Sequence, residues 1–127
     1  MVNRYLNRLY DTVVSRGYIE IEYLVFVVSQ SNQHGRIRGR LNFYDGSVLD
    51  FGEVILLRNG QIEKSRYGYH YQSSAGNLIF RYDNAPHYPH IMTHPHHKHV
   101  GSDVESAEVP DLSDVLREIE QMLFNGD

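Results

Sequence analysis

Short clusters of turn-forming residues recur between residues 19 and 83, and their spacing is the strongest constraint on the fold. The clusters are rich in Asn, Gly, Asp and Ser, which favour tight turns, and lie at residues 31–35, 44–47, 58–61 and 73–76. Between them lie segments rich in β-branched and aromatic residues, at 19–29, 36–43, 48–57, 63–72 and 77–83. Strands joined by such short turns must lie side by side and antiparallel. The sequence therefore predicts a five-stranded antiparallel meander.

Apolar residues recur at helical spacing at both ends of the chain. The first repeat lies within residues 3–16, and the second within residues 111–124, where acidic residues occupy the opposite face. Asp111 is placed to cap the start of the second helix. We therefore expect a single α+β domain over residues 1–127, with an N-terminal and a C-terminal amphipathic helix packed on one face of the sheet.

Two of the predicted strands place chemically useful side chains on one face. Alternation along 36–43 directs its apolar residues to the core and projects three guanidinium groups from the other face: Arg36, Arg38 and Arg40. Along 63–72 the tyrosines share one face, and His70 lies on the other. The arginines are either a solvated surface or a phosphate-binding row. The tyrosines either pack in the sheet or stack on bases.

Composition excludes several classes of protein. The chain has no cysteine, so it forms neither a disulfide framework nor a thiolate metal site. It has no apolar run long enough to span a bilayer and no signal-peptide pattern at its start, so we expect a cytoplasmic protein without membrane contact. Residues 1–102 hold eleven Lys and Arg against eight acids, whereas residues 103–127 hold one Arg against eight acids. The mildly basic body permits a polyanionic partner.

A histidine-rich segment follows the last predicted strand, which ends near Asp83. Six of the eight histidines and three of the four prolines lie within residues 84–100, where Lys98 is the only other charged side chain. Proline excludes a helix and disfavours a central strand, so we expect an extended loop. Imidazole titrates near neutral pH, so the cluster is a set of general acids and bases, a metal site or an anion-binding surface.

Metal-independent cleavage of RNA is one chemistry that these residues permit. The reaction needs a base for the 2′-hydroxyl proton, an acid for the leaving 5′-oxygen and a cation for the phosphorane charge. The candidate proton carriers are His87, His90, His94, His96 and His97. Asp83 would orient an imidazole through its ring N–H. The candidate phosphate-binding residues are Arg36, Arg38, Arg40, Arg81 and Lys98.

A transition-metal site is the alternative, with zinc or manganese as the ion. Its candidate ligands are His94, His96, His97 and His99, with Asp83 or His87 completing the set. The spacing matches none of the well-known zinc motifs, and an exposed histidine-rich loop also binds metal incidentally. Mg²⁺-dependent phosphoryl transfer usually needs a pair of carboxylates, and the loop region offers only Asp83.

Several segments of the chain together carry a family resemblance. The longest is Ile-Phe-Arg-Tyr-Asp-Asn-Ala-Pro-His at residues 79–87, followed by Pro89-His90 and by His-Pro-His-His-Lys-His at residues 94–99. Further segments are Tyr44–Ser47 with Phe51 and Glu53, Tyr-His-Tyr at residues 69–71, and Pro-Asp-Leu-Ser-Asp-Val-Leu at residues 110–116. With these motifs the chain resembles the TumE family of small prokaryotic toxins, from about residue 20 to 120. The resemblance implies a growth-inhibiting toxin of a type II toxin–antitoxin pair, neutralised by a cognate protein antitoxin, and it adds His70 to the site candidates.

The sequence as a whole therefore predicts a toxin that acts as a small endoribonuclease through its histidine-rich loop and needs no cofactor. The alternative is a non-enzymatic module whose loop binds metal or a protein, and whose acidic tail contacts the antitoxin. RNA and the antitoxin are the expected partners. An exposed sheet edge would also permit a homodimer.

Overall fold

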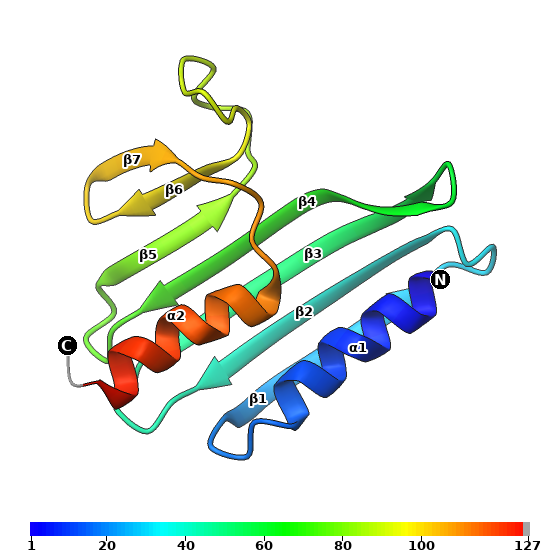
Figure 1. Ribbon diagram of the computed structural model, residues 1–127. Helices are drawn as coiled ribbons and strands as arrows, with labels where there is room; N and C mark the ends of the chain where they lie inside the picture. Colours follow the sequence, from blue (N-terminus) through cyan, green and yellow to red (C-terminus); the bar gives the residue numbers. More distant parts are fainter. Residues whose placement is uncertain (126–127) are drawn as a thin grey trace.

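Each strand of the protein pairs antiparallel with the next one along the chain, in a single sheet of order β1 to β7 (Figure 1). The computed structural model describes residues 1–125; the last two residues of the predicted domain lie outside this range. The strands are β1 (Glu20–Val28), β2 (His34–Asn42), β3 (Val48–Arg58), β4 (Gln61–Gln72), β5 (Leu78–Asp83), β6 (His97–Val100) and β7 (Asp103–Ser106). The helices are α1 (Val2–Val14) and α2 (Leu112–Phe124). The α+β class and both helices are confirmed.

The prediction of five strands is wrong, because the sheet has seven. Residues 97–106, expected to be loop and connector, form the β6–β7 hairpin beside β5 (Figure 1). The prolines of the histidine-rich segment all precede β6, so its backbone N–H groups are free to pair. Gly101, with φ +60°, supplies the left-handed turn residue between the two strands.

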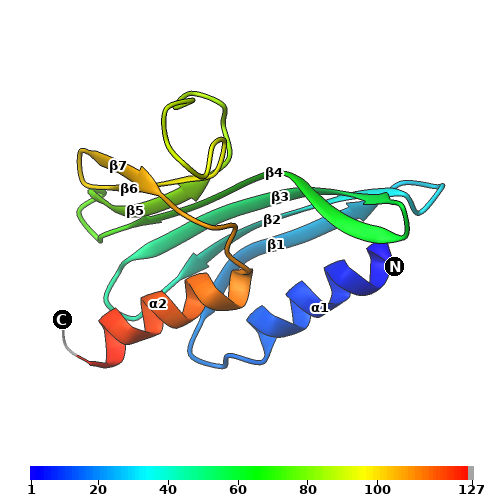
Figure 2. The ribbon, with the colours of Figure 1, turned by 45° about the horizontal axis from the view of Figure 1, so that its top comes forward.

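Both helices cover the same face of the sheet and leave the other face without helices (Figure 2). The residues of α1 and α2 that pack against the sheet are Val2, Leu6, Leu9, Val13, Leu112, Val115, Leu116, Ile119 and Leu123. Asp111 and Asp114 form a capping box at the start of α2, which fixes where the helix begins. Neither helix of the described chain is long and apolar enough to cross a membrane.

The tyrosines of β4 belong to the core under the helices. Tyr67, Tyr69 and Tyr71 are 6%, 0% and 1% exposed. Tyr69 stacks on Phe51 with ring centroids 6.1 Å apart, and Tyr71 packs against Phe80 at 5.3 Å. Since their rings are covered, these tyrosines pack the sheet and do not offer a surface for stacking bases.

A buried carboxylate ties α1 to the middle of the sheet. Glu53 on β3, 1% exposed, accepts hydrogen bonds from the hydroxyl of Tyr5 on α1, at 2.6 Å, and from that of Tyr69. The ammonium of Lys64 lies 3.5 Å from the same carboxylate and donates to the carbonyl of Pro110, which leads into α2. Burial, with Glu53 as a neighbour, raises the pKa of Tyr5, so its hydroxyl remains a donor at neutral pH.

We expect Glu53→Leu to lower the free energy of unfolding by roughly 3 kcal/mol, because it leaves the Lys64 ammonium, in a side chain only 10% exposed, without a counter-charge. Urea titration followed by circular dichroism measures the loss. The double variant Glu53→Leu/Lys64→Met removes both charges and should recover part of it. Glu20→Leu, at an exposed position of β1, is the control. A single variant as stable as the control would contradict the importance of this pair.

Candidate functional site

Alternation along the strands gathers charged side chains on the helix-free face. One row of directly paired positions crosses β2 to β6 and consists of Arg40, Asp50, His70, Arg81 and His99. The next row, two residues along each strand, consists of Arg38, Gly52, Gly68, Asp83 and His97. Neighbouring strands lie about 4.8 Å apart, so each row places these side chains in immediate succession.

Asp83, 5% exposed, is the centre of the site. Its Oδ1 lies 2.9 Å from Nε2 of His97 and accepts from the backbone N–H of Ala85 at 3.0 Å. Its Oδ2 accepts from Nε of Arg81 at 2.9 Å and lies 3.7 Å from Nε2 of His99. Because donors surround both oxygens, the carboxylate holds Arg81 and His97 in fixed positions, with His99 close by.

His97 is buried and held at both ring nitrogens. Its side chain is 1% exposed, and its Nδ1 lies 2.8 Å from the carbonyl oxygen of Pro95. Each ring nitrogen therefore faces an acceptor, the carbonyl of Pro95 or the carboxylate of Asp83. His97 is too enclosed to contact a large substrate, and its geometry is that of a positioning residue.

His99 and His70 are the imidazoles that solvent can reach on the two sides of Arg81. The side chain of His99 is 24% exposed, and that of His70 is partly exposed. Burial lowers the pKa of His99; Asp83 opposes this shift, and His97 and Arg81 add to it. Burial also lowers the pKa of His70, with a further contribution from Arg81 and opposition from Asp50.

Tyr88, in the segment between β5 and β6, covers the cluster. Its ring centroid lies 5.0 Å from that of His97 and 5.8 Å from that of His99. His87 and His90 are exposed and lie against the same ring at 6.5 and 6.2 Å. Tyr88 was not among the predicted site residues, since only the fold brings this residue onto the paired histidines.

The structure does not bring His94, His96 and Lys98 into this cluster. His94 is exposed, with its Nδ1 3.1 Å from the carbonyl oxygen of Tyr88. Lys98 lies on the helix face, where it pairs with Glu118 of α2 at 2.8 Å. Because Lys98 and Arg81 lie on opposite faces, they cannot hold one phosphate between them.

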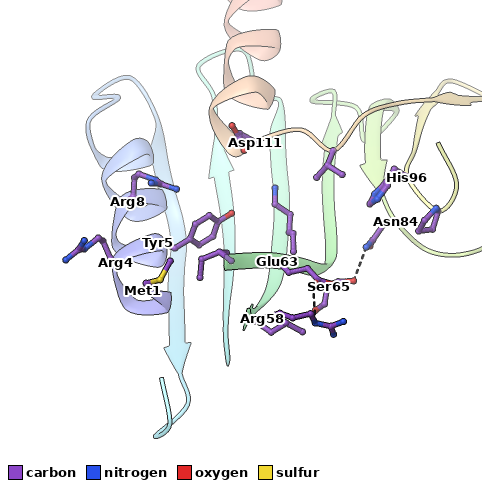
Figure 3. Close-up of a pocket in the computed structure, with 15 residues that line it drawn as sticks. Met1, Arg4, Tyr5, Arg8, Arg58, Glu63, Ser65, Asn84, His96 and Asp111 are labelled. Atoms are coloured by element: carbon purple, nitrogen blue, oxygen red, sulfur yellow. Dashed lines mark hydrogen bonds and ion pairs between the residues drawn. The ribbon is translucent and has the colours of Figure 1, made fainter. Parts of the chain in front are cut away.

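His96 lines a different cavity, of about 950 Å³, on the helix side of the sheet (Figure 3). Its Nδ1 lies 3.0 Å from the Tyr67 hydroxyl, and its ring stacks on that tyrosine. In Figure 3 His96 and Asn84 form one wall, and Tyr5 and Arg8 of α1 form the opposite wall. The side-chain amide of Asn84 donates to the carbonyl of Ser65 at 2.9 Å. His96 is the one histidine among the residues that line this cavity, which therefore offers no imidazole pair.

The arginines of β2 differ in their availability. Arg40 pairs with Asp50 at 2.7 Å and with Glu22 at 3.3 Å, and its bond to Asp50 raises the pKa of the guanidinium. Arg36 and Arg38 are exposed. Arg38 also lines a groove of about 520 Å³ on the helix-free face, together with His70 and Arg81. The predicted arginine row is thus on the same face as the Asp83 cluster.

Asp83, His97 and His99 also have the donor atoms of a metal site. Within residues 1–125 they form the one group of three such side chains whose ligand atoms all lie within 4.8 Å of one another. The bond from Nδ1 of His97 to a backbone carbonyl is the arrangement found behind many metal-binding histidines. Of the predicted metal ligands, His97 and His99 converge with Asp83, which was expected to complete the set, whereas His94 and His96 lie elsewhere.

Comparison with known proteins identifies one family. The family model described as Toxin TumE matches residues 8–123, which is nearly the whole chain. No curated protein and no solved structure gives a significant match. The family resemblance of the central motif and its neighbours is therefore confirmed.

We expect diethyl pyrocarbonate to modify His97 much more slowly than His94, because His97 is buried and bonded at both nitrogens. Asp83→Ala removes one bond to a charged group, worth about 1.5 kcal/mol or more, and should raise the rate at His97 about tenfold through local opening. Mass spectrometry of proteolytic peptides measures each rate, with exposed His94 as the internal reference. Equal rates at the two histidines in the unaltered protein would contradict the buried position of His97.

Proposed function

The chain belongs to the TumE toxin family, and on that premise we propose that it is a ribonuclease that cleaves RNA on the helix-free face of its sheet. Its toxin role implies a cognate antitoxin that neutralises it. We place its action in the cytoplasm, where RNA is accessible. Family membership alone does not define the chemistry, which has to be argued from the site.

The observation that carries the proposal is the order His70–Arg81–His99 on three adjacent strands. Arg81 is the direct pairing partner of both histidines, one on β4 and one on β6. Two strand spacings separate the Cα atoms of the histidines by roughly 10 Å. A phosphodiester above Arg81 would thus have an imidazole on each side, the arrangement that in-line transfer at phosphorus requires.

Each group has a defined part in the proposed reaction. One imidazole accepts the proton of the 2′-hydroxyl as the 2′-oxygen attacks phosphorus. The other, in its protonated form, donates to the 5′-oxygen as the P–O5′ bond breaks. The products are a 2′,3′-cyclic phosphate and a free 5′-hydroxyl. Arg81 stabilises the charge that develops on the phosphorane oxygens.

Asp83 and His97 support this reaction without contacting the substrate. Asp83 fixes Nε of Arg81, so the Nη groups of the guanidinium remain available to phosphate. His97 anchors Asp83 from the other side, and its own ring is fixed by the carbonyl of Pro95. A positioned guanidinium loses little conformational freedom on binding, and this lowers the cost of reaching the transition state.

A metal-dependent version of the same cleavage is the second candidate. The convergence of Asp83, His97 and His99 favours it, because a zinc or manganese ion held there would polarise a phosphoryl oxygen or activate a water. His99 would then be a ligand, and His70 would lose its partner in proton transfer. Dependence on metal therefore separates the two candidates.

We expect purified protein to cleave total RNA in excess chelator and to leave 2′,3′-cyclic phosphate ends, which mass spectrometry of the fragments identifies. His70→Ala and His99→Ala should each lower the rate about 100-fold or more, because each removes one proton-transfer group. His94→Ala, which changes an exposed histidine outside the cluster, is the matched control and should cleave at the normal rate.

Other results of the same experiment would favour one of the alternative mechanisms. Loss of cleavage in chelator, with recovery on adding zinc or manganese, would replace the proton-transfer mechanism with the metal centre. Absence of cleavage with and without metal would refute the ribonuclease proposal and favour a toxin that acts as a binding module. Normal cleavage by His70→Ala would remove that residue from the mechanism.

A further inference from the structure

Two facing glycines open a hollow in the helix-free face beside the proposed reaction centre. Gly52 on β3 and Gly68 on β4 are direct pairing partners and lie between Arg38 on β2 and Asp83 on β5. The groove of about 520 Å³ runs over both glycines. A sheet normally carries side chains at such central positions, and glycine there weakens it, so the open space needs a reason.

Backbone conformation does not provide that reason. Neither glycine has the positive φ that would exclude other residues. A Cβ at Gly52 would meet only ordinary contacts, at 3.6 Å from the carbonyl oxygen of Ile37 and 3.8 Å from the side chain of Arg38. A Cβ at Gly68 would lie 2.8 Å from Nη2 of Arg81. Gly68 thus makes room for the guanidinium of Arg81, and Gly52 leaves the adjoining space empty.

Positive charge surrounds this hollow. Arg38, Arg66 and Arg81 line it from three strands. In the part of the chain that the structure describes, Arg38 and Arg66 form no ion pair within 4.0 Å, and both are exposed. Two acidic residues also line the groove. The carboxylate of Asp50 is already paired with Arg40, and that of Glu53 is buried on the helix side, where it pairs with Lys64. The available charge in the hollow is therefore positive.

We propose that the hollow over Gly52, beside the Arg81 guanidinium that lies over Gly68, binds a backbone phosphate next to the scissile one, so that the substrate is a single strand crossing the sheet from β6 towards β2. This inference rests on the proposed function, because it takes the Arg81 row as the place of cleavage. Arg38 and Arg66 hold the second phosphate with their planar guanidinium groups. Tyr23 on β1, 36% exposed, lines the far end of the groove and offers a ring face to a base.

Single-stranded rather than double-stranded nucleic acid fits this surface. The arginines lie on a sheet face, where a flexible strand can bring successive phosphates down onto neighbouring strands. Exposed bases of a single strand can also reach Tyr23, whereas those of a duplex are stacked inside it. The hollow therefore deepens the proposed function by defining the substrate as an unpaired polynucleotide.

Binding of a short fluorescent single-stranded oligodeoxynucleotide tests the subsite separately from cleavage, because DNA lacks the 2′-hydroxyl that the reaction needs. Fluorescence anisotropy should show binding that weakens as salt rises. Gly52→Val, which fills the hollow, and Arg38→Gln, which removes one cation, should each weaken binding about tenfold, as expected for loss of one charged hydrogen-bonding contact. Arg38→Gln should also lower the dependence of log K on log salt by about 0.7.

Arg4→Gln is the matched control, because Arg4 is an exposed arginine on α1 and should not affect this binding. Thermal unfolding followed by circular dichroism checks that Gly52→Val is folded, and Arg38→Gln leaves the backbone unchanged. Normal binding by folded Gly52→Val and by Arg38→Gln would overturn the subsite, as would no binding by the unaltered protein at low salt.

The test also separates the failure of this inference from that of the proposed function. Binding that depends on Gly52 and Arg38 without any cleavage of RNA would support the subsite and refute the ribonuclease. If the protein cleaves RNA but Gly52→Val and Arg38→Gln do not change its oligonucleotide binding, the ribonuclease proposal is supported and the subsite is refuted.

Discussion

The two-residue period of a β-strand, applied to a sheet with helices on one face only, determines where each candidate residue on a strand lies (Figure 2). Packing against α1 and α2 takes one residue of each consecutive pair into the core. The next residue is then left on the helix-free face, where the arginines of β2 lie beside exposed valines of β1. Along residues 96–98 this rule divides the histidine-rich motif: His97 joins Asp83, whereas Lys98 faces α2. The histidines do not act as one cluster, because adjacent residues lie on different surfaces.

Asp83 organises the side chains on the helix-free face into a defined site. It ends β5, pairs with His97 on β6, and accepts bonds from Arg81 and from the backbone that follows it. A buried carboxylate is costly unless donors surround it, and here the donors are the same groups that would bind or transform a phosphate. The short β6 therefore depends on the same contact that orients Arg81. A change at Asp83 would alter the edge of the sheet and the reaction centre together.

Local signals in the sequence were sufficient for most of the fold but not for the composition of the site. Turn residues and apolar periodicity predicted two helices and five strands, and strict alternation predicted the face of Arg36, Arg38 and Arg40. The β6–β7 hairpin was not predicted from the sequence, because its strands are short and polar and gain their stability by pairing with β5. The row of paired positions that contains His70 and His99 was not predicted either, since it depends on the register of strands far apart in sequence. Register is a property of tertiary structure, and single-strand patterns do not contain it.

The acidic charge of the chain does not oppose a polyanionic substrate on the helix-free face, because part of it lies on α2 and pairs with cations on the helix side. Glu118 pairs with Lys98, and Glu120 pairs with Arg16 at the end of α1. These contacts place negative charge on the helix side of the sheet and neutralise it there. The formal net charge of −4 is thus an average over two unlike surfaces. On the helix-free face, Arg38 and Arg66 keep their charge for a ligand, and a low-dielectric sheet beneath them strengthens their field at the groove.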